Sequence, residues 1–348
     1  MKRIKLITDT DITAEKKAYD RWNSVAKPLH SLGLLEKSVI QIAGITGSEN
    51  VSLDKRCVVD MCADNGVVCE GVTQSDSSVT KIVAQAMAEG TSNINKMAGV
   101  CNADVIAVDI GINSDVDCEN LVNCKISYGT ENITTGSALT VEQAERAISA
   151  GMDMVGELKE KGYKIIVTGE MGIGNTTTSS AIASVILGFP PEYVTGKGAG
   201  LDNDGLNRKI SAVKRAIEIN QPTPEKPLEL LAKLGGYDIA GIAGLFLGGA
   251  VYHVPIVIDG FISAVSAAIA VLMCPKAKGY MLCSHVSKEP AGKIVLDYLG
   301  MKPLITAEMC LGEGTGGVLL LPMIDAALAV YNSAHRFDEL PMERYKEY

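Results

Sequence analysis

The stretch YKIIVTGEMGIGNTTT at residues 163–178 joins a short apolar run to a glycine-rich turn and three threonines. The apolar run predicts a buried strand at residues 163–168, and the threonines stand where a helix would begin. Glycines let backbone N–H groups approach a ligand, and a helix N-terminus favours a phosphate. The spacing matches neither a Walker A loop nor the dinucleotide motif G-x-G-x-x-G. A tight strand-to-helix turn capped by threonine is the alternative interpretation.

The same unit recurs along the chain, as an apolar run, then an acidic or glycine-rich turn, then a helical pattern. Apolar strands that alternate with helices indicate a parallel sheet with helices on both faces. We therefore predict an α/β fold with a Rossmann-like sheet. The expected strands are residues 56–62, 103–108, 163–168, 254–258 and 279–283.

Helix signals lie between these runs. Thr140 and Gln143 form a capping box ahead of an amphipathic pattern. Residues 239–258 carry no formal charge, and a stretch of that length could span a bilayer. Several glycines and Pro255 interrupt it and no basic segment flanks it, so we predict a buried helix to about Tyr252 and then a strand.

The 348 residues divide into two expected parts. Residues 51–330 form the large α/β domain. Residues 1–50 and 331–348 are helical and polar in pattern, and we expect them to pack together as a small helical domain built from both chain ends.

The composition narrows the class of function. The formal net charge is −9, which argues against a nucleic-acid partner, because such binding needs a basic surface. The nine cysteines include no C-x-x-C pair, so we expect buried thiols in a cytoplasmic protein rather than a zinc site. The first residues lack the apolar segment of a signal peptide.

Polar side chains follow the expected strands. Ligands of open parallel sheets bind beyond the carboxyl ends of the strands, so these groups could converge on one cleft. The alternative is that each caps the following helix. No G-x-S-x-G elbow accompanies the Ser-His pair, which disfavours a hydrolase triad. The groups are Asp64, Asp109, Glu170, Asp259 and the Ser284–His285 pair.

Two further glycine-rich segments carry candidate chemistry. In LGEGTGG at residues 311–317, Glu313 stands alone between small residues, where a flat ligand could approach it. An apolar setting would raise its proton affinity, as a general base requires, although a surface turn is the alternative. TGKGAGLD at residues 195–202 precedes a helix with four basic residues. Those residues could neutralise a phosphate or form a solvated helix face.

These motifs occur together in one known family. The chain resembles the nicotinate-nucleotide–dimethylbenzimidazole phosphoribosyltransferases, which activate the lower base of cobamides. The matching strings follow the family order from about residue 20 to about residue 330. They are Lys27-Pro28 with Ser31-Leu32-Gly33, Ala63-Asp64-Asn65-Gly66-Val67, Glu70-Gly71-Val72, residues 169–177, Gly235 to Ala240, Asp259 to Ile262, Ser284-His285 with Glu289-Pro290, and residues 311–316.

The resemblance implies a reaction and assigns residues to it. The phosphoribosyl group of nicotinate mononucleotide would pass to 5,6-dimethylbenzimidazole or a related base, giving α-ribazole 5′-phosphate and nicotinate, without a cofactor or metal. Glu313 would be the general base, and Glu170 would contact the reacting ribose. The resemblance places the phosphate or ribose on Gly172, Gly174, Asn175, Thr176, Thr177 and Lys209, and the incoming base near Ser75, Val83 and Met171. It also implies a dimer.

Several positions depart from the family pattern. Asn65 replaces the usual histidine, Leu29-His30 replaces Pro-Gly, the segment at residues 74–78 is unusually polar, and Val83 is apolar. These departures leave the acceptor open: a benzimidazole, a purine, or a phenol, the last of which relatives accept through paired unlike subunits. A homodimer is expected, and a heterodimer or a non-catalytic subunit is the alternative. A Rossmann-type oxidoreductase is disfavoured because no dinucleotide fingerprint follows the first strand.

Overall fold

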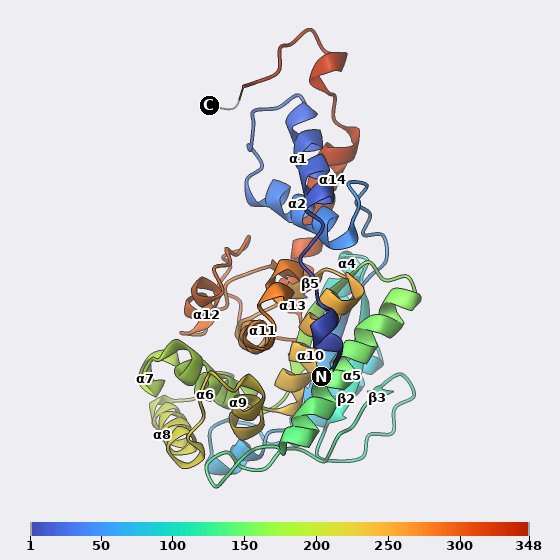
Figure 1. The fold of residues 1–348 in the computed structure, drawn as a ribbon. Helices are drawn as coiled ribbons and strands as arrows, with labels where there is room; N and C mark the ends of the chain where they lie inside the picture. The colour runs from blue at the N-terminus through green and yellow to red at the C-terminus, as the bar shows by residue number, and fades with distance from the viewer. Residues whose placement is uncertain (1, 347–348) are drawn as a thin grey trace.

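The computed structural model describes residues 2–346 and shows a central sheet in which every pairing is parallel (Figure 1). Within this range the strand order is β3-β2-β1-β4-β5-β6, which is the order of a doubly wound Rossmann sheet. This confirms the predicted fold class. The strands are β1 (Arg56–Ala63), β2 (Asp104–Gly111), β3 (Val122–Asn123), β4 (Ile165–Met171), β5 (Ile256–Ile258) and β6 (Met281–Cys283).

Three strands differ most from the sequence prediction, and one of them, β2, ends at Gly111 instead of Val108. Strand β3 is not predictable from the sequence, because two residues are too few to show a strand pattern. Strand β4 continues to Met171 instead of ending at Thr168. Glu170 and Met171 extend it because they pair with Met61 and Cys62 of β1. Glu170 is therefore held by the sheet and not by a mobile turn.

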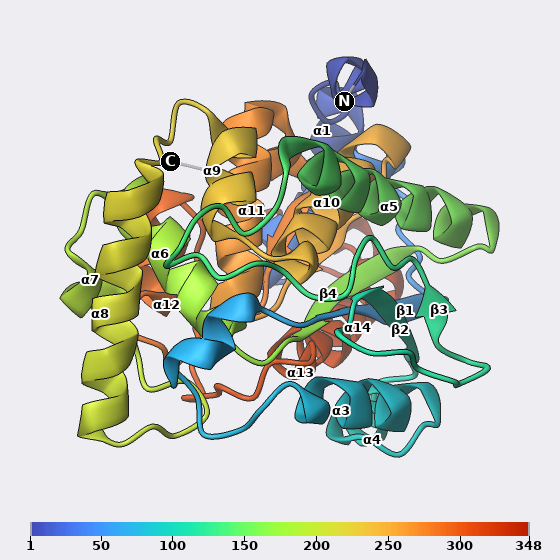
Figure 2. The same ribbon diagram turned by 90° about the horizontal axis from the view of Figure 1, so that it is seen from below.

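Helices cover both faces of the sheet (Figure 2). Side chains alternate along β1, so Val59 and Met61 join a first core while Val58 and Cys62 join a second. The first core lies against α5 (Val141–Glu160), α6 (Asn175–Leu187), α9 (Pro227–Leu234), α10 (Tyr237–Tyr252) and α11 (Phe261–Met273). The second lies against α3 (Ser78–Ala88), α4 (Asn93–Val100), α13 (Thr315–Val318) and α14 (Leu320–Ser333).

The local helix predictions hold. Thr140 and Gln143 form the capping box at the start of α5. The uncharged segment is a buried helix, α10, which ends at Tyr252 before β5. Helix α10 packs closely on α5, since a Cβ at Gly151 would overlap the carbonyl oxygen of Gly241. The remaining elements are α7 (Pro191–Val194), α8 (Asn203–Asn220), α12 (Gly292–Tyr298), η1 (Lys2–Leu6), η2 (Gly66–Glu70), η3 (Pro275–Tyr280) and η4 (Phe337–Glu339).

The stretch Thr315–Ser333 is long and apolar enough, by length and composition alone, to cross a membrane. More than half of its most apolar window is buried inside the protein. Its first residues form α13, which contacts β4 and α4. We therefore interpret it as a core helix.

Helices from the two chain ends pack together at one end of the molecule (Figure 1). They are α1 (Ile12–Ser24), α2 (Leu34–Thr46) and α14. The rings of Trp22 and Tyr331 lie 5.0 Å apart, and Val25 forms an isolated bridge with Arg336. Helix α14 spans Leu320–Ser333, so the predicted domain boundary after residue 330 falls inside it. The same helix also packs on the second core. The division into two domains stays a prediction.

Candidate active site

A cavity of about 150 Å³ lies beyond the carboxyl ends of β4, β5 and β6. We call it the strand-end cavity. Glu170 and Met171 reach it from β4, Asp259 follows β5, and His285 follows β6. It is also lined by Val72 to Gln74, Gly172 to Thr176, Lys197 to Ala199, Leu201, Lys209, Gly260 to Ser263, Ser287, Glu289 and Cys310 to Glu313.

Only part of the expected convergence of polar groups occurs. Glu170, Asp259 and His285 line the cavity, whereas Asp64 and Asp109 do not. Asp109 forms an ion pair with Lys125 at 3.0 Å, and Asp64 accepts a hydrogen bond from the backbone N–H of Asn113. These two carboxylates stabilise the loops after β1 and β2.

The turn from Gly172 to Gly174 forms one wall. Gly174 has φ +96°, a left-handed conformation that favours glycine. A Cβ at Gly172 would lie 2.5 Å from the carbonyl oxygen of Ala63, so the chain must pass there without a side chain. Helix α6 begins at Asn175, and Thr176 at its first turn faces the cavity.

Lys209 brings a buried positive charge to the same wall. It lies on the inward stripe of α8 with Gly205, Ala212 and Val213, which is why it is buried while Lys214 is exposed. Its Nζ donates a hydrogen bond to Thr176 Oγ1 at 2.7 Å. Burial lowers the pKa of Lys209 to about 8, and the nearby Glu289 opposes this shift.

Glu289 holds the second glycine-rich loop beside Lys209. Its carboxylate faces the backbone N–H of Gly198, and a Cβ at Gly196 would overlap Oε2. Burial raises the pKa of Glu289, and Lys209 and the backbone N–H of Gly198 oppose the change by lowering it. The start of α6, the loop at residues 196–200 and α8 thus form one cradle with a single fully buried ammonium group.

Glu170 is one of two glutamates that line the cavity next to this cradle. The side-chain amide of Asn175 donates hydrogen bonds to Glu170 Oε2 and, at 3.0 Å, to Asp238 Oδ2. Burial raises the pKa of Glu170 well above its ordinary value, and the charge of Asp238 adds to this. Burial also raises the pKa of Asp238 to about 6.

Glu313 is the other of these two glutamates. Its side chain is buried in the cavity wall, and Oε2 has no hydrogen-bond partner. Burial raises its pKa, while a hydrogen bond from the backbone N–H of Ile94 opposes the shift. Glu170 lies next to this segment, since a Cβ at Gly312 would overlap Glu170 Oε1. A carboxylate with a raised proton affinity and an unpaired oxygen can accept a proton from a ligand.

One acidic residue close to Glu313 and Asp259 was not predicted from the sequence. Asp60 is fully buried in β1, and neither carboxylate oxygen has a hydrogen-bond partner. Burial raises its pKa well above the ordinary value, and the charges of Glu313 and Asp259 add to this. The only signal was a single acidic residue inside the apolar run RCVVDMC.

The other predicted positions fall outside the cavity lining. Thr177 is buried in α6, because each helical residue turns about 100° from its neighbour, and of these two threonines Thr176 is the one that faces the cavity. Ser75 and Val83 are half-buried and do not line the cavity, although Ser75 directly follows the lining segment at residues 72–74. Asn65 accepts a hydrogen bond from Thr178 in the protein interior.

Among residues 2–346, no group of three or more His, Cys, Asp and Glu side chains is arranged to hold a metal ion. The expectation of a reaction without a metal or cofactor stays a prediction.

Comparison with known proteins identifies the family. A family model described as phosphoribosyltransferase matches residues 7–340. A nicotinate-nucleotide–dimethylbenzimidazole phosphoribosyltransferase of Ruminiclostridium cellulolyticum is 46% identical over 99% of this chain and 97% of its own length. The chain belongs to the nicotinate-nucleotide–dimethylbenzimidazole phosphoribosyltransferase family. The enzyme of that name from Acetivibrio thermocellus is 45% identical over 94% of this chain and 93% of its own length.

The fold of this family member agrees with a solved structure. The crystal structure of CobT from Thermus thermophilus superposes with a TM-score of 0.90 at 34% identity, covering 96% of this chain and all of that chain. The resemblance drawn from the sequence motifs is therefore confirmed at the level of the family and the fold.

Proposed function

We propose that this chain transfers the phosphoribosyl group of nicotinate mononucleotide to a lower-ligand base, 5,6-dimethylbenzimidazole or a related base. The products are α-ribazole 5′-phosphate and nicotinate, as needed for the nucleotide loop of cobamides. One observation carries the proposal. A cationic, glycine-lined cradle and an unpaired, buried glutamate line the same small cavity.

The cradle suits the 5′-phosphate of the nucleotide. Lys209 supplies the charge, Thr176 a hydroxyl, and the backbone from Gly172 to Gly174 a surface without side chains. A phosphate fixed at this wall aligns the ribose with the two glutamates next to the cradle, which lowers the entropic cost of reaching the transition state. Gly172, Gly174, Asn175, Thr176 and Lys209 are the residues we assign to this role.

The two glutamates suit the bond exchange. The pyridinium ring of nicotinate mononucleotide already carries a positive charge, so nicotinate leaves without protonation. Positive charge then develops at the ribose anomeric carbon, where the carboxylate of Glu170 stabilises it. The incoming base attacks through a ring nitrogen, and Glu313 Oε2 accepts the proton from that base. One general base is enough for this reaction.

Met171 lines the cavity beside Glu170. Met171 and Val83 pack on the same second core, and the loop at residues 72–74 lines the cavity next to Ser75. We assign Met171, Ser75 and Val83 to the acceptor side on this basis. The apolar Val83 and the polar loop at residues 74–78 also fit a phenolic or purine acceptor, which is the alternative.

We further propose a cytoplasmic homodimer that binds neither nucleic acid nor a membrane. The acidic net charge supports the absence of a nucleic-acid partner. A heterodimer with a related chain is the alternative. Glu313 in the cavity wall and the intact cradle argue against a non-catalytic subunit.

A competition assay tests the function and the acceptor together. The purified chain is incubated with nicotinate mononucleotide and equal amounts of dimethylbenzimidazole, adenine and p-cresol, and mass spectrometry identifies the ribotides formed. We expect dimethylbenzimidazole ribotide phosphate as the main product with matching nicotinate release. A purine or phenol ribotide would select the alternative acceptor, and no ribotide of any kind would refute the proposed function.

A further inference from the structure

The segment that carries Glu313 has an unusual backbone. Gly312, Glu313 and Gly314 all have positive φ angles, of 85°, 58° and 71°. We call residues 311–317 the Glu313 turn. Glycine adopts this conformation freely, but glutamate does so at a cost of about 1–2 kcal/mol. Such a residue persists only where its surroundings hold it in place. Contacts outside the turn must therefore fix Glu313.

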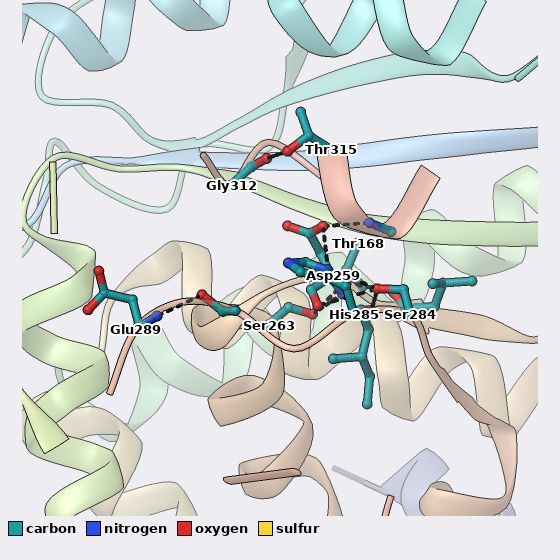
Figure 3. A network of polar contacts seen from close by, with 12 residues as sticks. Thr168, Asp259, Ser263, Ser284, His285, Glu289, Gly312 and Thr315 are labelled. Atoms are coloured by element: carbon teal, nitrogen blue, oxygen red, sulfur yellow. Dashed lines mark hydrogen bonds and ion pairs between the residues drawn. The ribbon is translucent and has the colours of Figure 1, made fainter. Parts of the chain in front are cut away.

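Asp259 provides those contacts. Asp259 Oδ1 accepts a hydrogen bond from the backbone N–H of Gly317 at 2.6 Å. Burial raises the pKa of Asp259 to about 7, and the nearby backbone N–H groups of Gly314, Gly316 and Gly317 oppose this shift. Figure 3 shows Asp259 close to the start of α13, with Gly312 and Thr315 of the turn drawn above it. One buried carboxylate thus binds the backbone N–H of Gly317 directly and faces two further amides of the segment that begins just after Glu313.

The position of Asp259 is itself fixed by the sheet (Figure 3). Its backbone N–H donates to Ser263 Oγ at 3.2 Å. Ser263 Oγ lies 2.6 Å from Thr168 Oγ1, and Thr168 Oγ1 donates to the carbonyl oxygen of Val257. This chain of hydrogen bonds ties Asp259 to β4, β5 and α11. The anchor of the Glu313 turn is therefore part of the rigid core.

Glycine at the facing positions makes this close approach possible. A Cβ at Gly316 would overlap the ring of His285, and a Cβ at Gly317 would overlap a methyl group of Val167. The ring nitrogen Nδ1 of His285 lies 3.9 Å from Asp259 Oδ1 and 3.2 Å from Ser284 Oγ. Burial lowers the pKa of His285, which favours the neutral ring beside Asp259.

We propose that Asp259 is a positioning residue that acts through Glu313, by binding the backbone amides of the Glu313 turn so that the carboxylate of Glu313 faces the acceptor base. This inference rests on the proposed function of Glu313 as general base. It assigns to Asp259 no contact with the reacting atoms. The alternative role for a carboxylate in this cavity wall is direct stabilisation of the positive charge on the ribose.

Asp259→Asn tests the role with little change in volume. The amide keeps only one acceptor oxygen, so at most one N–H group of the turn keeps its partner, while the new NH2 group faces backbone amides that also donate and loosens the turn. We expect kcat to fall about 100-fold, as small misplacements of catalytic groups do. The KM for nicotinate mononucleotide should stay within about twofold, because the cradle is built from Lys209, Thr176 and the loop held by Glu289, on other elements than Asp259.

A double-mutant cycle with Glu313→Gln separates the two roles. If Asp259 acts through Glu313, then Asp259→Asn costs less than about threefold once Glu313 is replaced, although it costs about 100-fold in the wild type. If the carboxylate stabilises the ribose charge directly, the 100-fold loss persists in the Glu313→Gln background. Persistence of the loss would overturn the proposal.

Hydrogen exchange gives a measurement that does not depend on turnover. In Asp259→Asn, peptides containing residues 314–317 should exchange their amides at least tenfold faster, while peptides of β4 remain protected. Unchanged exchange would overturn the proposal even if activity falls. Wild-type protein that exchanges as expected but forms no ribotide would instead refute the proposed function, so the two failures are distinguishable.

Thr315 offers a second variant if Asp259→Asn does not fold. Its Oγ1 donates to the carbonyl oxygen of Gly312 at 2.7 Å and so closes the same turn from the other side. Thr315→Val should lower kcat about tenfold with an unchanged KM for the nucleotide, and Thr315→Ser, which keeps the hydroxyl, should restore kcat. Equal activity of the two variants would contradict a positional role for the Glu313 turn.

Discussion

Replacing Lys209 by methionine should make the unliganded protein more stable and less active at the same time. Burial lowers the pKa of Lys209 from 10.5 to about 8. That difference corresponds to about 3 kcal/mol of unfavourable free energy for holding the charge in the folded state at neutral pH. Loss of the hydrogen bond from the charged ammonium group to Thr176 offsets about 1.5 kcal/mol, the lower end of the range for such bonds. We therefore expect Lys209→Met to raise the free energy of unfolding by about 1.5 kcal/mol.

The same substitution should weaken phosphate binding. A hydrogen bond from a charged group contributes about 1.5–3 kcal/mol, so kcat/KM for nicotinate mononucleotide should fall about 10- to 100-fold, mostly through KM. Thermal unfolding without ligand should show a Tm higher by about 2 °C for a chain of this length. Lys214→Met, on the exposed side of the same helix, is the matched control and should change neither quantity.

The stability difference between Lys209→Met and the wild type should depend on pH. The folded-state pKa of Lys209 lies below the unfolded one, so the burial penalty is fully present below about pH 8 and disappears as the pH rises to 10.5. The stability advantage of Lys209→Met should shrink over that interval. A variant that is less stable than the wild type at pH 7, with an unchanged KM, would refute the reasoning.

The residues of the strand-end cavity allow three further predictions. Gly174→Ala should lower the Tm and raise the KM for nicotinate mononucleotide at least about tenfold, because φ is +96° and the new Cβ would lie 2.9 Å from Val68; unchanged kinetics would contradict this. The kcat should fall as the pH is lowered, and the fall should begin above the ordinary pKa range of glutamate. The reason is that burial raises the pKa of Glu313 and the base works only when deprotonated. A fall that begins only near pH 4 would contradict this. Met171→Ala should change the ratio of ribotides in the competition assay and leave the KM for the nucleotide unchanged, whereas a fixed ratio would remove Met171 from the acceptor side.

Sequence reasoning succeeded where a pattern was local and repeated. Alternation of apolar runs and helices predicted the parallel sheet, and Thr140 with Gln143 predicted the start of α5 correctly. The glycines and Pro255 of the uncharged segment at residues 239–258 correctly predicted a buried helix followed by a strand, which are α10 and β5. These signals come from the spacing of apolar residues in helices and strands, which is visible within one short segment of the sequence.

The rest depends on contacts between distant segments. In the sequence Lys209 is one of four basic residues on a predicted helix. Only the packing of α8 in the structure shows that this lysine is buried. Asp64 and Asp259 both follow strands, yet only Asp259 reaches the cavity, because the site lies beyond β4, β5 and β6. Asp60 gave little signal, since a buried carboxyl group without partners contradicts the usual rule for a strand interior.

The most direct test of the account is the turnover of Glu313→Gln with nicotinate mononucleotide and dimethylbenzimidazole. The amide keeps the shape of the side chain but cannot accept the proton, so nicotinate release should fall by about 100- to 10,000-fold. The Kd for nicotinate mononucleotide, measured by calorimetry, should remain within about threefold of the wild type. Nicotinate release at the wild-type rate by this variant would contradict the central claim that Glu313 is the general base.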